Sequence, residues 1–242
     1  MAEAFLWGLL AGSSLVLGGL VALYAPIRLR LLGLVMAFGA GVLISAVSFE
    51  LVEEAFTQSH SASAVALGLF AGALVFYLGD EAIDHMGGGD RKRSGGAQAS
   101  GSGYAIVLGI VLDGIPESMV IGLGLLESGE VSAAVIVAVF LSNLPEAIAA
   151  THGLVTAGWQ RTKILGLWAL VMLVTALSSL AGYALFDAAS DEAVAFVLAF
   201  AGGAVLTMLA DTMMPEAFEH GGKLVGLATT LGFAVAFAVT AL

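Results

Sequence analysis

Long apolar stretches alternate with short polar breaks along the whole chain. A hydrocarbon core about 30 Å thick is crossed by a helix of about 20 apolar residues, and stretches of that length recur eight times. They are rich in Ala, Leu, Val and Gly and do not alternate apolar with polar residues, as the strands of a membrane barrel do. The pattern predicts an all-α integral membrane protein with eight transmembrane helices, at roughly 5–24, 31–52, 64–84, 104–126, 131–156, 163–186, 193–215 and 222–242.

The composition strengthens this prediction. The 242 residues are 60% hydrophobic and 11% charged, which is far from the composition of a soluble globular domain. The first stretch carries Glu3 and no basic residue, and no polar domain follows it, so we expect a retained helix and not a cleaved signal peptide. We expect the whole chain, 1–242, to form a single transmembrane domain surrounded by membrane lipid.

The positions of the charges say more than the net charge of −11. The basic residues lie only in alternate loops, at Arg28, Arg30, Arg91, Lys92, Arg93, Arg161, Lys163 and Lys223. Because Lys and Arg of short loops stay on the cytoplasmic side, this predicts both termini outside and supports the number of eight helices. It also places the Gly/Ser-rich segment 86–103 inside, as a flexible cytoplasmic loop between helices 3 and 4. Nothing in the pattern favours nucleic-acid binding.

A similar segment occurs twice. Residues 37–56, AFGAGVLISAVSFELVEEAF, align without gaps on residues 199–218, AFAGGAVLTMLADTMMPEAF. The identical positions pair Ala37 with Ala199, Phe38 with Phe200, Gly41 with Gly203, Glu54 with Glu216, Ala55 with Ala217 and Phe56 with Phe218. Helix 2 would run outward and helix 7 inward, so we expect an inverted repeat of helices 1–3 and 6–8 around helices 4 and 5, as in many secondary transporters. Glu54 would then lie near the outer face and Glu216 near the inner face.

Helices 4 and 5 share a second pattern in the middle of the membrane. LDGIPES at 112–118 matches LSNLPEA at 141–147, and each places a Pro-Glu pair near the centre of its stretch. Asp113 and Glu117 are four residues apart and Asn143 and Glu146 three apart, so each pair shares a helical face. Such charges at the bilayer centre normally face a cavity on an ion path. The alternative is a hydrogen-bonded network that only ties the helices together.

Further polar residues lie closer to the predicted membrane surfaces. They can form a relay or path for cations, or be ordinary residues of solvated helix ends: Asp211, Glu54, Glu216, Asp80, Asp84 and His85. We expect His60 and His220 to lie in loops and His152 to be structural, since it is off the face of Asn143 and Glu146. The chain has no cysteine, so a metal site would use oxygen and nitrogen ligands only.

At these residues the sequence resembles the ZIP (Zrt/Irt-like protein) family of metal transporters. The family has eight helices, both termini outside, a long cytoplasmic loop after helix 3, and metal ligands around Pro-centred motifs on helices 4 and 5. The segment ADTMMPE at 210–216 is similar to the family's His-Glu-x-x-Pro-Glu. The ligands depart from the family pattern. On helix 4, Asp113 replaces the family's His and Gly114 replaces its Asn. On helix 5, Ser142 replaces Gln or His and Asn143 replaces an acidic residue. Glu117 and Glu146 are retained. Thr175 lies near the place of a Glu that some members have.

The resemblance implies a divergent bacterial-type member in the bacterial inner (plasma) membrane. It also implies a homodimer that carries divalent cations into the cytoplasm by an elevator-like movement. The metal ligands would be Asp113, Glu117, Ser142, Asn143 and Glu146. This set offers oxygen donors only, which suit harder ions such as manganese or magnesium, while imidazole favours zinc. We expect a divalent metal ion (Zn, Mn, Fe or Cd) as substrate, and no enzymatic activity.

Two other classes of function stay open. The chain can be a ZIP-like sensor or scaffold that has lost transport, and the missing imidazole supports this alternative. It can also be an intramembrane hydrolase that uses Asp113 or Glu117 as acid or base. Metal uptake into vesicles separates transport from both alternatives, and peptide cleavage would identify the hydrolase.

Overall fold

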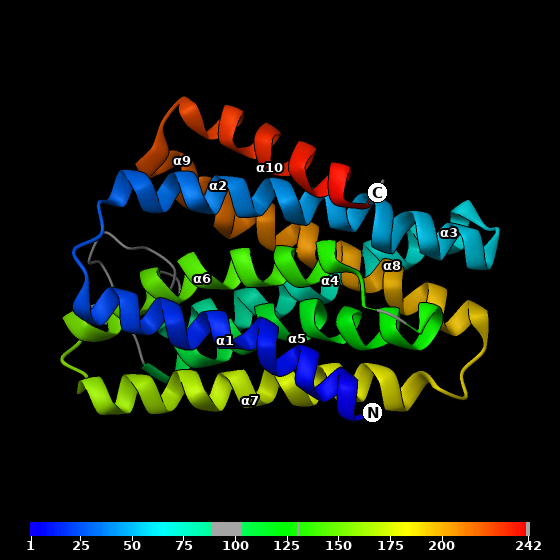
Figure 1. The fold of residues 1–242 in the computed structure, drawn as a ribbon, viewed down its shortest axis with the longest axis horizontal. Helices are drawn as coiled ribbons and strands as arrows, with labels where there is room; N and C mark the ends of the chain where they lie inside the picture. Colours follow the sequence, from blue (N-terminus) through cyan, green and yellow to red (C-terminus); the bar gives the residue numbers. More distant parts are fainter. Residues whose placement is uncertain (89–102, 130, 241–242) are drawn as a thin grey trace.

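The chain folds into a bundle of long helices (Figure 1). The structure is a computed structural model that describes residues 1–88, 103–129 and 131–240. Within these ranges it contains helices and turns and no strand. The elements are α1 (Ala2–Tyr24), α2 (Leu29–Ala46), η1 (Val47–Val52), α3 (Glu53–Ser59), α4 (Ala62–Ile83), η2 (Asp84–Gly88), α5 (Gly103–Ser128), α6 (Ala133–Thr156), α7 (Arg161–Phe186), α8 (Asp191–Met208), η4 (Leu209–Met213), α9 (Met214–Gly221) and α10 (Leu224–Thr240).

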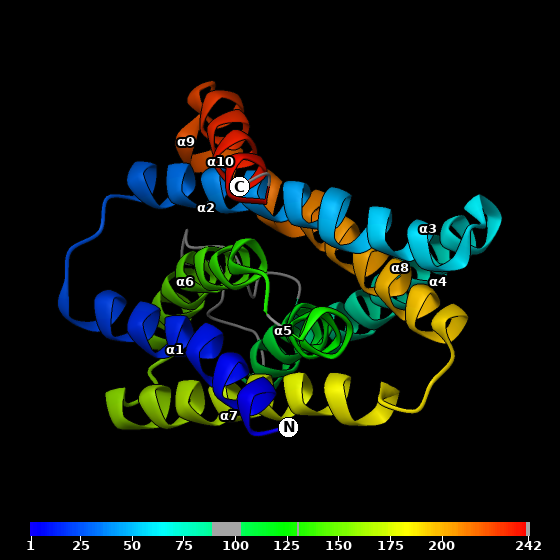
Figure 2. The same cartoon turned by 45° about the vertical axis from the view of Figure 1, so that its right-hand side comes forward.

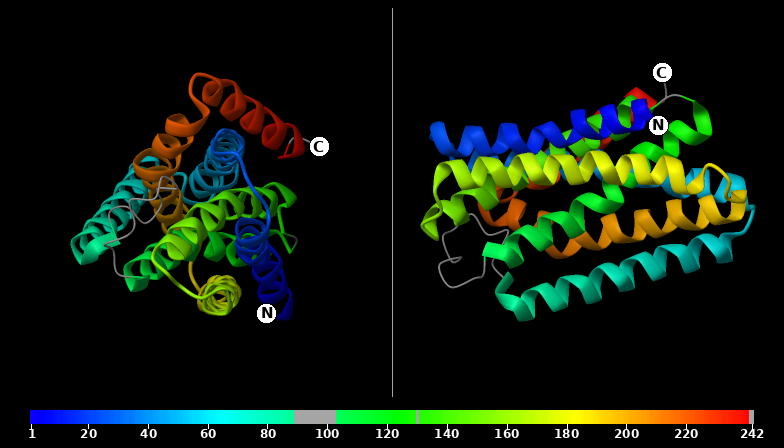
Figure 3. Two further views of the ribbon diagram at one scale, coloured as in Figure 1. Left: turned by 90° about the vertical axis from the view of Figure 1, so that its left-hand side faces the viewer. Right: turned by 90° about the horizontal axis from the view of Figure 1, so that it is seen from below.

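The described residues form seven helices that are long and apolar enough to cross a membrane. The eighth predicted stretch corresponds to α10, an apolar helix of 17 residues. The chain therefore has the helices of a membrane protein. Of the predicted flexible loop 86–103, residues 89–102 lie outside the described part of the chain. The start of α1 and the end of α10 lie toward the same end of the bundle (Figure 3).

Two helices are longer than predicted. The runs Leu29–Ser59 and Asp191–Gly221 are helical throughout and span 31 residues each, whereas the predicted stretches ended at about 52 and 215. A stretch predicted from hydropathy ends where acidic residues begin, because they lower the mean hydropathy. An acidic residue does not, however, end a helix. Each run contains one π-helical segment, η1 or η4, and these begin at Val47 and Leu209. Val47 and Leu209 are aligned with each other in the sequence repeat. The two similar segments therefore share the same local backbone irregularity.

Close contacts between helices are made through glycines. Between α2 and α10, a Cβ on Gly41 would collide with the carbonyl oxygen of Thr229. A Cβ on Gly232 would collide in the same way with the carbonyl oxygen of Phe38. Only glycine at both positions lets the two backbones approach this closely.

The contact between α4 and α8 has the same form. A Cβ on Gly203 would meet the carbonyl oxygen of Leu69, and one on Gly72 would meet that of Phe200. Phe200 and Gly203 of α8 are aligned with the Phe and Gly that α2 uses against α10. Aligned residues of the two similar segments thus make equivalent contacts with two different partner helices.

These contacts leave α5 and α6 in the middle of the bundle. Helix α6 packs against α1 and α2, while α5 packs against α7 and α8. Figure 2 shows α5 and α6 between a layer that contains α1 and α7 and a layer that contains α2 and α8. The two helices with Pro-Glu motifs therefore lie in the interior, where side chains from both layers can approach them.

Candidate metal site between α5 and α6

All five predicted ligands lie on these two central helices, in the interior of the bundle. Both helices continue through their prolines, Pro116 in α5 and Pro145 in α6. Proline removes a backbone hydrogen bond but can be accommodated in a helix that packed neighbours support. The exposed fractions of the predicted ligands are 2% for Asp113, 3% for Glu117, 0% for Ser142, 3% for Asn143 and 6% for Glu146. Three carboxyl groups are therefore buried in the helical interior.

Glu117 of α5 and Ser142 of α6 contact each other directly. The Ser142 hydroxyl lies 3.4 Å from one carboxylate oxygen of Glu117 and 3.3 Å from the other. It also lies 3.1 Å from the carbonyl oxygen of Val139, one turn earlier in its own helix. The two Pro-Glu helices are thus joined by a polar contact at the level predicted for the metal site.

The other predicted ligands are also buried on α5 and α6, but the acidic side chains do not come together in one cluster. Among the described residues, no group of three or more His, Asp or Glu side chains is close enough together to hold a metal ion. The Nδ2 group of Asn143 is buried and has no hydrogen-bond acceptor among the residues that the structure describes. A buried amide donor without a partner costs about 1–3 kcal/mol, which is a reason to look for a function at this position. A complete metal site at this level needs the neutral donors or a movement of the helices.

The α7 side of the site is open at Gly114. A Cβ on Gly114 would lie 4.0 Å from the hydroxyl oxygen of Thr175, so the position could hold a small side chain. Thr175 is buried and donates a hydrogen bond of 3.0 Å to the carbonyl oxygen of Val171. Gly114 and Thr175 stand where the ZIP pattern has larger polar groups, and the structure places them opposite each other.

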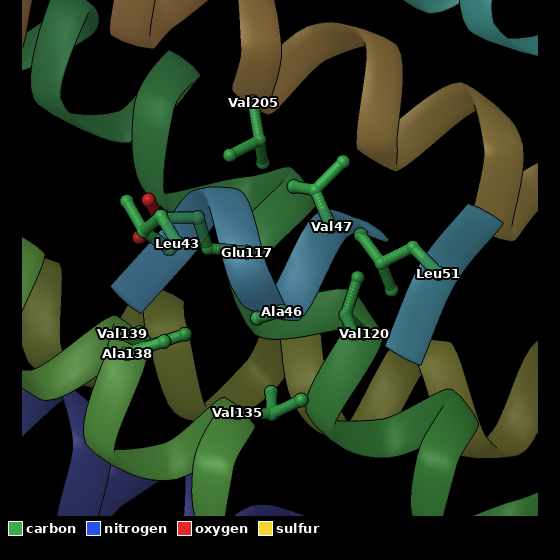
Figure 4. A pocket seen from close by; sticks show the side chains of 10 residues that line it. All are labelled: Leu43, Ala46, Val47, Leu51, Glu117, Val120, Val135, Ala138, Val139 and Val205. Atoms are coloured by element: carbon green, nitrogen blue, oxygen red, sulfur yellow. The ribbon is translucent and has the colours of Figure 1, made fainter. Parts of the chain in front are cut away.

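A cavity of about 20 Å³ lies beside Glu117. Figure 4 shows the Glu117 carboxylate among apolar side chains from α2, η1, α5, α6 and α8. Its other lining residues are Leu43, Ala46, Val47, Leu51, Val120, Val135, Ala138, Val139 and Val205. A space of this size holds about one water molecule. A hydrated ion therefore does not fit beside Glu117 in this conformation.

A second cavity, of about 30 Å³, is lined by Glu50, Ser132, Gly124 and several apolar side chains. Both cavities are lined by Val120 and Val135. These two valines therefore separate the space beside Glu50 from the space beside Glu117. The conformation is closed between the two acids.

Two of the predicted path residues, Glu54 and Glu216, are aligned with each other in the sequence repeat. Each of them has a polar partner four residues further along its helix. Glu54 is half-buried and accepts a hydrogen bond of 3.1 Å from the side-chain amide of Gln58. Glu216 is buried, and its carboxylate oxygen lies 3.9 Å from Nε2 of His220. The expectation that His220 lies in a loop is wrong, because α9 extends the seventh helix through Gly221. Continuing the repeat to residues 58 and 220 would have shown the pairing of both glutamates with a polar residue four positions on.

The remaining path residues are found at the surface of the bundle. Asp211 is exposed in η4 and lines a groove between α4 and α8. Asp80 is half-buried near the end of α4, while Asp84 and His85 are exposed in η2. His85 faces Glu81 at 3.2 Å in a largely exposed pair. These four residues belong to helix ends and outer faces, in contrast to the five buried residues of α5 and α6.

Neither a scan against protein-family models nor a search of curated proteins finds a match to this chain. The similarity to ZIP proteins therefore rests on the motifs of the chain itself. The function has to be argued from the buried polar groups of α5 and α6 and from the helices that surround them.

Proposed function

We propose that the chain is a ZIP-like transporter that carries divalent metal cations across the membrane into the cytoplasm. The observation that supports this most is the contact between buried Glu117 of α5 and buried Ser142 of α6. It joins two proline-containing helices in the centre of the bundle. A stability role alone does not require carboxylates at this depth, since apolar packing would serve the same purpose at lower cost.

The charge of the site favours a cation as substrate. A carboxylate at the centre of a membrane costs about 2.5–3.5 kcal/mol on insertion scales. A dication bound by Asp113, Glu117 and Glu146 would offset this cost, while Ser142 and Asn143 would supply neutral donors. The donor set consists of oxygens, which suits manganese as well as zinc, iron or cadmium.

Transport requires the cavities beside Glu117 and Glu50 to become connected. The two small cavities are separated by Val120 and Val135, so the helices must move before an ion can reach the site. An inverted repeat of helices 1–3 and 6–8 would provide two equivalent end states for such a movement. The glycine contacts of α2 with α10 and of α4 with α8 support this arrangement, because aligned residues make them. We propose an elevator-like movement of the α5–α6 pair with its neighbours.

The placement in the membrane follows from the basic loops. With Lys and Arg on the cytoplasmic side, both termini are outside, and a bacterial inner membrane is the proposed location. The start of α1 and the end of α10 lie toward the same end of the bundle, which is compatible with this topology (Figure 1). A homodimer is the proposed assembly, by analogy with the ZIP family.

Metal uptake into proteoliposomes tests the transport function. The purified protein is reconstituted with an internal divalent-ion dye, and zinc, manganese, cadmium, iron and magnesium are offered in turn. We expect uptake of at least one ion, and a loss of at least tenfold for Glu117→Ala and for Glu146→Ala. Glu219→Ala is the matched control, because Glu219 is an exposed acid at the far end of the seventh helix. Folded protein that takes up none of the ions would disprove transport.

A second candidate function is a metal sensor or scaffold without transport. It is favoured by the missing imidazole in the candidate ligand set, where Asp113 stands in place of the His of the ZIP pattern. The two functions differ in a simple measurement. A sensor binds metal in detergent but gives no metal uptake into vesicles, whereas the transporter gives both.

A further inference from the structure

The two aligned glutamates of the repeat have chemically different partners. Glu54 is paired with Gln58, a neutral amide that carries both a donor and an acceptor. Glu216 is paired with His220, an imidazole that can be a metal ligand. Both pairs are four residues apart on one helix, so both side chains of each pair lie on the same face. The two similar segments therefore differ four residues after the shared glutamate, where one has the amide of Gln58 and the other the imidazole of His220.

The separation in the Glu216–His220 pair matches that of two ligands of one ion. The distance of 3.9 Å between Nε2 of His220 and the carboxylate oxygen of Glu216 is too long for a direct hydrogen bond. Zinc lies about 2.0–2.1 Å from an imidazole nitrogen and about 2.0–2.2 Å from a carboxylate oxygen. An ion held by both atoms therefore needs them 3–4 Å apart, which these distances imply. The amide pair at Glu54 is instead closed by its hydrogen bond of 3.1 Å.

The pair is also enclosed by the protein. The side chain of Glu216 is 4% exposed and that of His220 is 10% exposed. Helix α2 covers it at Gly33, where a Cβ would come within 2.9 Å of the His220 Cβ and 2.8 Å of the Ala217 carbonyl oxygen. A glycine at this position allows α2 to approach α9 closely. An ion held here would be screened from bulk water on the side of α2.

We infer that Glu216 and His220 form a second site for a divalent cation, at the cytoplasmic end of the seventh helix. The chain supplies one imidazole nitrogen and one carboxylate oxygen, and water completes the coordination, as at metal sites that keep open positions. The mixed donors select borderline ions such as zinc over magnesium, in contrast to the oxygen donors between α5 and α6. With two protein ligands the ion is held weakly and exchanges readily. The role of the site as a stop on the way out of the membrane rests on the proposed transport, but the binding itself does not.

Copper(II) is a suitable probe, because it binds nitrogen and oxygen sites more tightly than other divalent first-row ions. Pulsed electron paramagnetic resonance of Cu²⁺ detects an imidazole nitrogen bound to the ion. The full chain in detergent, after removal of any histidine tag, is titrated with Cu²⁺. In a chain that also carries His60→Gln and His85→Gln, which remove the exposed imidazoles, we expect an imidazole-coordinated copper that is lost in His220→Gln, a change that copies the amide of the Glu54 pair. Glu216→Gln should weaken the binding at least tenfold.

Three control variants make the result specific. His152→Gln removes another imidazole and Glu219→Gln a neighbouring exposed acid, and neither should change the signal of the His220 copper. Glu117→Gln should abolish metal uptake and leave this copper in place, so failure of transport and failure of this inference are separate results. Persistence of the same imidazole signal and affinity in folded His220→Gln protein would overturn the inference. Unchanged copper affinity in Glu216→Gln would overturn the role of Glu216 as a ligand.

Discussion

The hydroxyl of Ser142 on α6 faces both carboxylate oxygens of Glu117 on α5, at 3.4 and 3.3 Å. A hydroxyl has one proton to donate, and here the two Glu117 oxygens and the carbonyl oxygen of Val139, at 3.1 Å, are its possible acceptors. Both residues are buried, at 0% and 3% exposure. The contact holds the Glu117 carboxylate toward α6.

Removal of the hydroxyl should weaken ion binding more than it affects folding. A hydrogen bond to a charged group contributes about 1.5–3 kcal/mol, which corresponds to roughly a tenfold change or more in an equilibrium constant. We expect Ser142→Ala to raise the KM for metal uptake about tenfold, while kcat changes less. Uptake kinetics in proteoliposomes measure both constants. Ser118→Ala is the control. Ser118 is a buried serine of α5, and its hydroxyl donates to the carbonyl oxygen of Gly114 in its own helix, as the hydroxyl of Ser142 does to that of Val139. An equal effect in the control would contradict the role of Ser142.

Asn143 should show a conflict between stability and transport. Its buried Nδ2 group has no acceptor in the described part of the chain, and such a group costs about 1–3 kcal/mol. We expect Asn143→Leu, which keeps the number and branching of the side-chain heavy atoms, to keep or raise the thermal midpoint of the metal-free protein in detergent and to reduce metal uptake at least tenfold. Asn143→Asp, which restores the acid of the ZIP pattern, should retain uptake. A Leu variant with full uptake would show that Asn143 has no part in the ion site.

The helices could be predicted from the sequence because hydropathy follows the solvent that a segment meets. The ends of the second and seventh helices could not, because Glu53 and Glu216 reduce hydropathy without breaking a helix. The burial of the candidate site residues could be predicted from their spacing. Asp113, Glu117, Asn143 and Glu146 have spacings that define helical faces, and all four are buried as expected.

Contacts between particular helices could not be predicted from hydropathy and residue spacing. Every face of an apolar helix is compatible with lipid, so hydropathy does not say that Ser142 meets Glu117 or that Gly114 lies opposite Thr175. For the same reason, the sequence did not predict the close approach of α2 to α10 at Gly41. His220 was a different case, because the alignment ended two residues before it. A longer alignment would have paired it with Gln58.

The absence of cysteine makes the closed conformation testable by labelling. Ser132 lines the cavity that contains Glu50, whereas Ala138 lines the cavity that contains Glu117. We expect Ser132→Cys to react with a membrane-impermeant thiol reagent at least tenfold faster than Ala138→Cys, because Val120 and Val135 separate the two spaces. Replacing Val135 by Ala in the Ala138→Cys chain should raise its labelling rate. Equal rates for the two single-cysteine variants, with the reagent added from the Glu50 side, would contradict the closure.

The repeat predicts that equivalent glycines have equivalent effects. A Cβ at Gly41 would collide with the backbone of α10, and a Cβ at Gly203 with the backbone of α4. Overpacking costs about 1–3 kcal/mol, so Gly41→Ala and Gly203→Ala should each lower the thermal midpoint in detergent by a similar amount. Gly166→Ala is the matched control within α7, since, apart from its chain neighbours and the backbone of its own helix, no atom of the described chain lies within 4 Å of its added Cβ. It should leave the midpoint unchanged or raise it slightly, because Ala is the better helix former. A loss at Gly41 with none at Gly203 would contradict the equivalence of the two contacts.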